Sequence, residues 1–355
     1  MIPGDRLPDC EGTSDEVGES HYLETREGSF LAIKGFEHPP NRWIGVLRYV
    51  FDAGHGDRQK GGKLYRRLYR FAEQEQWIRA AFPEYLAFDP VFQTTLQSVP
   101  RSLVQRIYDP CLRLRDLVQA CPEKGIEADA AAFAGFLQKE TGVPQSCLGI
   151  TGSLLIGLHT ELSDLDIAVF GAPRCRAVHR ALLRLLDSQS GKELSRLDAP
   201  GVQELYAQRI TDTPMAFHEF VNLEKRKTNQ GRFRNRMYFI RFIKGAGEAG
   251  LSYGQHRYTP LGRMRIAASI AGDQDAIFTP CRYLLSGARN LEGSPLPDLR
   301  EIVSFRGRFC EQARTGEAVV AAGTLERVQS KSGDTWHRLL LGNSTEDTLL
   351  VRQSV

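Results

Sequence analysis

The sequence has no long apolar run. None of its 355 residues lies in a stretch approaching the ~18 consecutive apolar residues that a membrane-spanning helix needs, so we predict no membrane span. The first twenty residues are acidic and polar and have no apolar core of the kind a secretory signal carries. We expect residues 1–20 to form a mobile tail. These absences together predict a cytoplasmic protein with no membrane partner.

Closely spaced metal-binding cysteines are also missing. The cysteines are odd in number and scattered, and no pair has the spacing of a zinc site: Cys10, Cys111, Cys121, Cys147, Cys175, Cys281 and Cys310. We therefore expect no zinc and reduced thiols. A strong charge of one sign is absent as well, because the formal net charge is only +3. Net charge alone therefore neither requires nor excludes a nucleic-acid partner.

The stretch from Gly149 to Gly171 carries the most specific pattern in the chain. One short apolar run ends in Gly152 and Ser153, and a second begins around Asp164 and Asp166. Residues two apart on a strand point the same way, so both carboxylates are expected on one face, where Mg²⁺ would relieve their repulsion. Gly152 permits close approach of the backbone, and the Ser153 hydroxyl can hold phosphate oxygens. The alternative is a capped turn followed by two solvated aspartates.

This pattern resembles the DNA polymerase β superfamily of nucleotidyltransferases, over roughly Glu127 to Lys244. The resemblance implies that Gly152 and Ser153 contact an incoming nucleoside triphosphate (NTP). It also implies that Asp164 and Asp166 are catalytic and bind two Mg²⁺ ions. Ser163 opens the same Ser-Asp-x-Asp motif and is assigned to the nucleotide site. The implied reaction moves a nucleoside monophosphate from an NTP to a hydroxyl and releases pyrophosphate.

The third carboxylate that this superfamily usually takes from a later strand is missing. The strand expected to supply it, Arg236 to Lys244, contains no acid and carries Arg241 where an aspartate would be expected. Asp212, Glu219 and Glu224 lie upstream and remain open alternatives. A nucleotide-binding or nucleic-acid-binding protein that has lost catalysis is therefore a second hypothesis.

Cations gather in three segments. Residues 224–244 hold eight cations against one acid, interleaved with aromatic residues, so we assign Lys225, Lys227, Arg232 and Arg234 to triphosphate binding. An N-terminal group either binds phosphates or forms a solvated face: Arg42, Arg48, Arg58, Lys60, Lys63, Arg66, Arg67 and Arg70. Residues 304–309 place two arginines beside two phenylalanines, which suits either a nucleic-acid contact or the solvated edge of a barrel.

Three folded modules are expected, because 355 residues exceed what one core usually holds. Residues 21–100 form a basic α/β module, residues 101–258 the nucleotidyltransferase domain, and residues 259–355 a β-rich domain built as a small barrel or sandwich. The predicted fold class is thus α+β, with a polymerase β-like palm in the middle.

Within these modules, alternating apolar residues predict strands over Ser29–Gly35 and Arg42–Phe51. Helical spacing predicts a helix over Lys63–Ala81, and a connecting helix with a proline break is expected over Arg101–Gln119. The local basic clusters make a nucleic acid, RNA or tRNA-like, the expected acceptor. Nucleotidylation of a protein or a small molecule, as toxins and resistance enzymes perform it, is the alternative.

Overall fold

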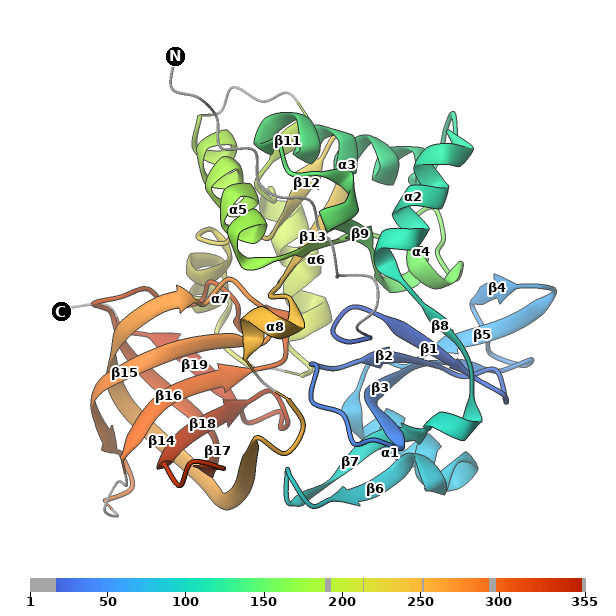
Figure 1. Ribbon diagram of the computed structural model, residues 1–355. Helices are drawn as coiled ribbons and strands as arrows, with labels where there is room; N and C mark the ends of the chain where they lie inside the picture. The colour runs from blue at the N-terminus through green and yellow to red at the C-terminus, as the bar shows by residue number, and fades with distance from the viewer. Residues whose placement is uncertain (1–16, 189–192, 213, 251, 294–297, 353–355) are drawn as a thin grey trace.

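The computed structural model describes residues 17–188, 193–212, 214–250, 252–293 and 298–352. It is an α+β protein in three parts, each with its own sheet (Figure 1). In Figure 1 the N-terminal sheet lies at the lower right, the helix-covered central sheet at the top and the C-terminal strands at the lower left. Most of the expected tail, residues 1–16, lies outside the described residues, whereas Glu19 and Ser20 are buried. No described helix has the length and apolarity that a membrane crossing requires.

The N-terminal part is an antiparallel assembly of eight strands in the order β4-β5-β3-β2-β1-β8, with β7 paired to β3 and to β6. The strands are β1 (Tyr22–Thr25), β2 (Phe30–Ile33), β3 (Arg42–Phe51), β4 (Arg58–Lys60), β5 (Lys63–Arg67), β6 (Leu86–Asp89), β7 (Thr94–Pro100) and β8 (Val104–Tyr108). One helix, α1 (Phe71–Ala81), and the short turns η1 (Pro83–Tyr85) and η2 (Arg101–Leu103) complete it. The two strands predicted from alternation are confirmed as β2 and β3.

Two helix predictions in this region are wrong over their first parts and confirmed over their second parts, as α1 and as the helix that begins at Pro110. Lys63–Arg67 is the strand β5, because Gly61 and Gly62 adopt left-handed φ values of 54° and 76° and close a tight hairpin with β4. Arg101–Gln119 divides into β8, which pairs with β1, and a helix that begins only at Pro110. Asp109 fixes that start, since its Oδ1 accepts from the Cys111 amide at 2.7 Å and the Leu112 amide at 3.1 Å.

The central part is a five-stranded sheet in the order β11-β12-β13-β10-β9. Its strands are β9 (Leu148–Ile150), β10 (Leu165–Phe170), β11 (Leu194–Ser195), β12 (Gln230–Phe233) and β13 (Arg236–Ile243). Its helices are α2 (Pro110–Ala120), α3 (Ile126–Thr141), α4 (Gly152–Ile156), α5 (Ala172–Asp187), α6 (Ala199–Arg209), α7 (Phe217–Glu224) and α8 (Ala246–Ala249), with η3 (Gln145–Cys147) before β9.

The two faces of this sheet have different surroundings. Apolar side chains of one face, among them Ile167 and Ile240, share a core with Phe133 of α3 and Leu182 of α5. Side chains alternate along a strand, so Asp166 and its neighbours two residues apart point to the opposite face. That face is turned toward the other two parts of the chain and carries the candidate site.

The C-terminal part is a closed barrel, which confirms one of the two predicted β architectures. The strands follow the order β14-β15-β16-β18-β17-β19, and a further pairing of β14 with β17 closes the ring. They are β14 (His256–Asp275), β15 (Cys281–Asn290), β16 (Leu299–Ser304), β17 (Ala318–Ser330), β18 (Thr335–Leu341) and β19 (Thr348–Val351), with η4 (Gly307–Phe309) after β16. Closure removes the free edges between β14 and β17.

The cysteines match the sequence prediction in part. Five are free thiols, namely Cys111, Cys121, Cys175, Cys281 and Cys310. Cys147 is disulfide-bonded, so the expectation of reduced thiols is wrong for this residue.

Candidate functional site

The Gly-Ser turn and the acidic strand are packed directly against each other. The Thr151 amide donates to the Asp166 carbonyl at 2.9 Å, which places Gly152 beside the Asp166 side chain. Gly152 has a left-handed φ of 66°, and a Cβ at this position would clash with Asp166 Oδ2. Only glycine satisfies both conditions. The sequence motif therefore corresponds to one compact structural unit.

The two carboxylates influence each other. Burial, and then the neighbouring Asp166, raise the pKa of Asp164 to about 6. Burial also raises the pKa of Asp166, against the opposing effect of Arg241, Arg67 and Arg48. An enclosed pair of this kind is stabilised by a proton or by a bound cation.

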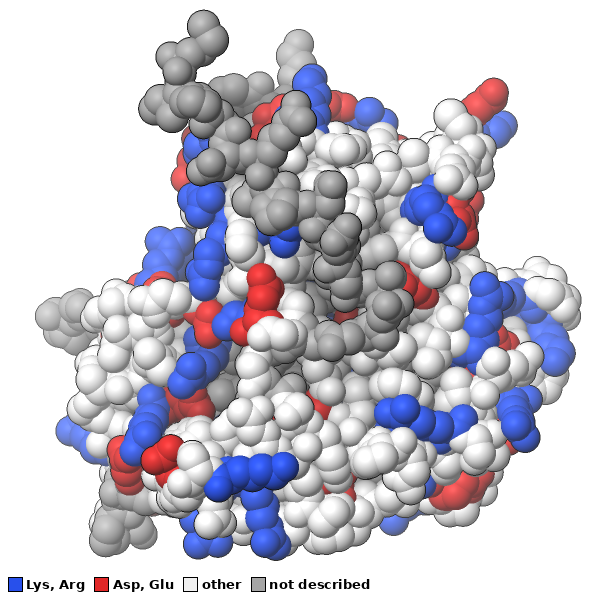
Figure 2. Space-filling model, viewed as in Figure 1, with Lys and Arg blue, Asp and Glu red and all other residues white. Residues whose placement is uncertain are grey.

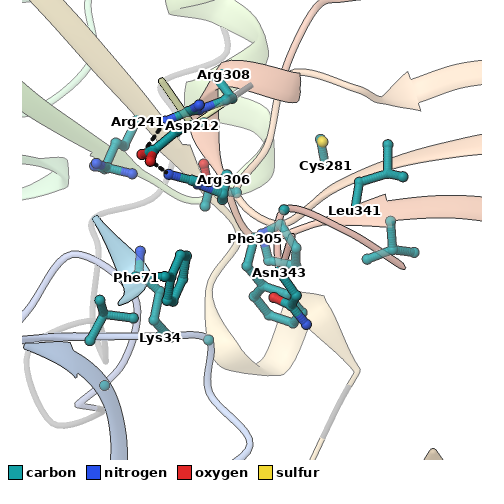
Figure 3. Close-up of a pocket in the computed structure, with 18 of the residues that line it drawn as sticks. Lys34, Phe71, Asp212, Arg241, Cys281, Phe305, Arg306, Arg308, Leu341 and Asn343 are labelled. Atoms are coloured by element: carbon teal, nitrogen blue, oxygen red, sulfur yellow. Dashed lines mark hydrogen bonds and ion pairs between the residues drawn. The ribbon is translucent and has the colours of Figure 1, made fainter. Parts of the chain in front are cut away.

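A cavity of about 1190 Å³ lies where the three parts of the chain meet, and Ser153, Ser163, Asp164 and Asp166 all line it. Its walls carry cations from every part: Lys34, Arg48, Arg58 and Arg67 from the N-terminal sheet, Arg209 and Arg241 from the central part, and Arg306 and Arg308 from the barrel. Figure 3 shows Lys34 and Phe71 facing Arg241, Arg306 and Arg308 across this space. The acid pair thus lies among several arginines, although the lining as a whole holds twelve cationic and nine acidic side chains.

Three of these guanidinium groups have weak internal compensation. Among the described residues, neither Arg48 nor Arg67 has a carboxylate within 4.0 Å, and Arg67 instead contacts the Tyr69 ring at 4.6 Å. The nearest carboxylate oxygen to Arg241 is Glu19 Oε1, at 4.0 Å. Burial lowers the pKa of Arg48, and the neighbouring Arg67 and Arg241 lower it further. Enclosed guanidiniums without paired acids are well suited to bind phosphate oxygens.

In the described part of the chain, β13 supplies no third carboxylate beside the pair, and the further acid whose charge raises the pKa of Asp164 is Glu204 of α6, which also lines the cavity. In the parallel register of β10 and β13, Phe239 is opposite Asp166 and Arg241 is opposite Ala168. Within the described ranges, no group of three or more His, Cys, Asp or Glu side chains is placed to hold a metal.

The three upstream acids are engaged elsewhere. Asp212 lines the cavity but pairs with Arg306 and Arg308. Glu224 is buried and pairs with Lys227 at 2.8 Å. Glu219 accepts from the Ala216 amide at 3.3 Å at the start of α7.

The four cations assigned to the triphosphate from the sequence are not brought to the acid pair. Lys225 is exposed, and Lys227 is buried with its Nζ on Glu224 and on the Arg308 carbonyl. Arg232 pairs with Asp198 at 3.4 Å and Arg234 with Glu193 at 3.0 Å. None of the four lines the cavity.

Two of the arginines whose charge acts on Asp166, Arg48 and Arg67, come from the N-terminal segment for which phosphate binding and a solvated face were both open interpretations. In β5, Arg67 lines the cavity while Arg66 is turned to the other side and lies over the Trp77 ring at 4.9 Å. The sequence feature that could have predicted this arrangement is the Gly61-Gly62 dipeptide, which indicates a hairpin. In the strand that follows a hairpin turn, the side chains of Arg66 and Arg67 point to opposite faces. A helix assignment for this segment concealed that alternation.

The outer surface carries no comparable concentration of charge on the face shown. Figure 2 shows Lys and Arg side chains spread over all three parts and mixed with Asp and Glu. The group of arginines around Asp166 therefore belongs to the cavity and not to this face.

In the comparisons with known proteins, one similarity extends over most of the chain. The chain is 28% identical over 332 residues to an uncharacterized protein of Methanocaldococcus jannaschii, across 92% of this chain and 95% of that protein. The match is long enough to include residues of all three parts. No family model matches the sequence, and no solved structure matches it.

Proposed function

We propose that this protein is a Mg²⁺-dependent nucleotidyltransferase that transfers a nucleoside monophosphate from an NTP to a hydroxyl group. One observation carries the proposal. Ser153 of the Gly152-Ser153 turn and the Asp164 and Asp166 carboxylates line the same cavity as Arg48 and Arg67, which have no carboxylate within 4.0 Å among the described residues. A Mg²⁺–triphosphate complex would fit this cavity, because the carboxylates would bind the metal and the guanidiniums would bind the phosphates.

The residues present fit a metal of this kind. Asp164 and Asp166 supply the hard oxygen ligands that Mg²⁺ prefers, and their raised pKa values reflect a site that favours added positive charge. When bound, the metal would supply charge neutralisation at the triphosphate and activation of the attacking oxygen.

The protein itself would bind and neutralise the triphosphate. Ser153 and the backbone at Gly152 would hold phosphate oxygens, while Arg48 and Arg67 of the N-terminal sheet and Arg241 of β13, the strand beside β10, would neutralise the triphosphate. Catalysis of this type depends on position and charge more than on covalent chemistry. We propose a nucleic acid, RNA or tRNA-like, as the acceptor because the cavity continues to the barrel wall, where arginine and aromatic side chains adjoin.

The test is transfer of label from each α-labelled NTP in the presence of Mg²⁺, with total RNA, DNA fragments and total protein as acceptors. The Asp164→Ala/Asp166→Ala double variant is the control. Label on RNA that disappears in the double variant is the expected result. Label on protein or on a small molecule would support nucleotidyl transfer but show that the acceptor is not a nucleic acid. Equal labelling by wild type and double variant would overturn the proposal.

A second candidate is a protein that binds Mg²⁺–NTP without turnover. The observation that favours it is Arg241 on the face where a third carboxylate would be expected. Equilibrium binding of each NTP, measured beside the transfer assay, separates the two functions. Metal-dependent binding with no label on any acceptor would establish the binding protein.

A further inference from the structure

The end of β16 brings two arginines and an aromatic ring to the cavity. Phe305, Arg306 and Arg308 all line it, beside Asn343 from the segment between β18 and β19. Figure 3 shows Arg306 and Arg308 meeting at Asp212, with Phe305 and Asn343 adjoining on the barrel side. These residues belong to the segment 304–309, for which the sequence left two interpretations: a nucleic-acid contact and the solvated edge of a barrel. Its side chains face the cavity, which argues against the solvated edge.

Asp212 bridges the two guanidiniums. Its Oδ2 lies 3.0 Å from Arg306 Nη2 and 3.3 Å from Arg308 Nη2. All three side chains are largely enclosed, with exposed fractions of 13% for Asp212, 19% for Arg306 and 16% for Arg308. A single carboxylate oxygen held by two guanidiniums has the same charge pattern as a phosphodiester oxygen in an arginine clamp.

The surroundings of this clamp remain cationic despite Asp212. Burial, together with Arg306 and Arg209, lowers the pKa of Arg308 to about 9 even though Asp212 opposes the shift. Arg306 is also among the cations that lower the pKa of Arg48, so the clamp and the wall facing Asp166 belong to one electrostatic field. An anion that carries more charge density than a carboxylate would be held more strongly at this point.

Two aromatic side chains adjoin the clamp. The Arg306 guanidinium lies 5.2 Å from the centre of the Phe71 ring of α1, and Phe305 is the residue before Arg306 in the chain. Asn343 is exposed to the cavity and carries both an amide donor and an acceptor. A phosphate clamp next to ring faces and a free amide is the combination that binds single-stranded nucleic acid.

We propose that Arg306 and Arg308 form the acceptor subsite of this cavity, where they bind a phosphodiester of a single-stranded nucleic acid, and that Asp212 fills the subsite as an internal substitute for that phosphate. The acceptor displaces the Asp212 carboxylate and places the adjoining base against Phe305 or Phe71. This inference rests on the proposed function, since it names the substrate class for the same cavity.

The test measures binding of a fluorescently labelled single-stranded RNA oligonucleotide of mixed sequence, without Mg²⁺ or NTP, over a range of salt concentrations. Asp212→Asn removes the competing charge and is expected to tighten binding roughly threefold to tenfold. Arg306→Gln/Arg308→Gln is expected to weaken binding by about tenfold or more and to lower the salt slope by about two.

Matched controls come from ion pairs outside the cavity. Asp187→Asn removes the same charge from a pair with Arg196, at 2.8 Å, and Arg300→Gln removes a cation from a pair with Asp298, at 2.7 Å. Both controls are expected to change RNA affinity by less than about twofold. Asp212→Glu retains the competing charge and is expected to bind RNA as wild type does.

Two results would overturn the inference. One is an Asp212→Asn variant, folded by thermal unfolding, that binds RNA no more tightly than Asp187→Asn. The other is a double arginine variant with the affinity and salt slope of Arg300→Gln, which decides the matter even if Asp212→Asn does not fold. The assay needs no turnover, so its outcome is independent of the labelling experiment. Wild-type protein that labels a small molecule yet binds no RNA would reject this inference and leave nucleotidyl transfer intact.

Discussion

Among individual side chains, Asp164 has a charge state that makes the stability of the folded protein depend on pH. Its pKa is raised from 3.8 to about 6, so between these values the folded protein holds a proton that the unfolded chain releases. The contribution of Asp164 to stability therefore falls as pH rises through this window. We expect Asp164→Asn to raise the free energy of unfolding at pH 7 by about 1 kcal/mol or less, after allowance for solvent screening.

Thermal unfolding at a series of pH values checks this prediction. The gain of Asp164→Asn over wild type should shrink as pH falls and disappear near 3.8, the ordinary pKa of aspartate. Asp187→Asn, an exposed acid outside the cavity, should show no such trend. A stabilisation that is independent of pH would indicate that the effect does not come from the charge of Asp164.

Gly152 provides a second prediction for a single position. Gly152→Ala would place a methyl group against Asp166 Oδ2 in a left-handed conformation, so Asp166 must move. We expect a loss of about 1–3 kcal/mol in stability and loss of Mg²⁺-dependent NTP binding. Thermal unfolding and equilibrium NTP binding measure the two effects.

Gly135→Ala is the matched control. Gly135 lies within α3, and a Cβ there meets no atom within 4 Å. Alanine should therefore stabilise the helix by about 0.5–1 kcal/mol and leave NTP binding unchanged. Equal NTP affinity in both variants would show that the Gly152 turn plays no part in the site.

Between secondary-structure elements, Glu311 joins the barrel to the central part through several hydrogen bonds. Its carboxylate accepts from the Thr228 amide at 3.0 Å, the Asn229 amide at 2.9 Å and the Thr228 hydroxyl at 2.8 Å. His179 Nε2 of α5 lies 2.8 Å from Glu311 Oε1. A buried carboxylate with this many donors is costly to neutralise, because the amide that replaces it cannot accept all of these bonds.

We expect Glu311→Gln to lower the free energy of unfolding by about 2–3 kcal/mol in denaturant unfolding. Glu317→Gln is the control on the same barrel, since Glu317 pairs with Arg226 at 2.9 Å but is more exposed. That variant should cost less than about 1 kcal/mol. Similar losses in the two variants would contradict the role assigned to burial at Glu311.

With the three parts considered together, the N-terminal sheet should take part in nucleotide binding. Arg67→Gln removes an arginine from the cavity wall, and we expect NTP affinity to fall by about tenfold, the effect of one charge-assisted phosphate contact. Arg66→Gln is the control, because Arg66 is the next residue of β5 and faces Glu73 and Trp77 instead. Isothermal titration with each NTP compares them. Equal affinities would exclude the N-terminal sheet from the nucleotide site.

Local patterns predicted much of the architecture. The alternation in Arg42–Phe51 corresponds to β3, because successive side chains of a half-buried strand point alternately to the core and to solvent. The apolar runs around Asp166 correspond to β9 and β10. The β-rich character of residues 259–355 was predicted as well, whereas closure of the barrel depends on the pairing of β14 with β17, which runs from Ser269 opposite Ala318 to His256 opposite Ser330.

The partners of charged residues were not predictable in the same way. The sequence grouped Lys227 with Arg232 as triphosphate ligands, but Lys227 is buried on Glu224 and Arg232 pairs with Asp198. The sequence shows which residues are cationic. Which acid each cation pairs with depends on how elements distant in the sequence pack together. Arg67 faces the acid pair only because β5 joins the sheet next to β3.

The position of the cavity also has a consequence for synthesis of the chain on the ribosome. Its lining runs from Lys34 to Asn343, so residues from nearly both ends of the polypeptide must be present before the cavity is complete. The central sheet can form once β13 has emerged, yet the barrel wall with Arg306 is made last. A nascent chain therefore exposes Asp164 and Asp166 well before it can enclose the proposed nucleotide, and binding in this cavity cannot guide the early stages of folding.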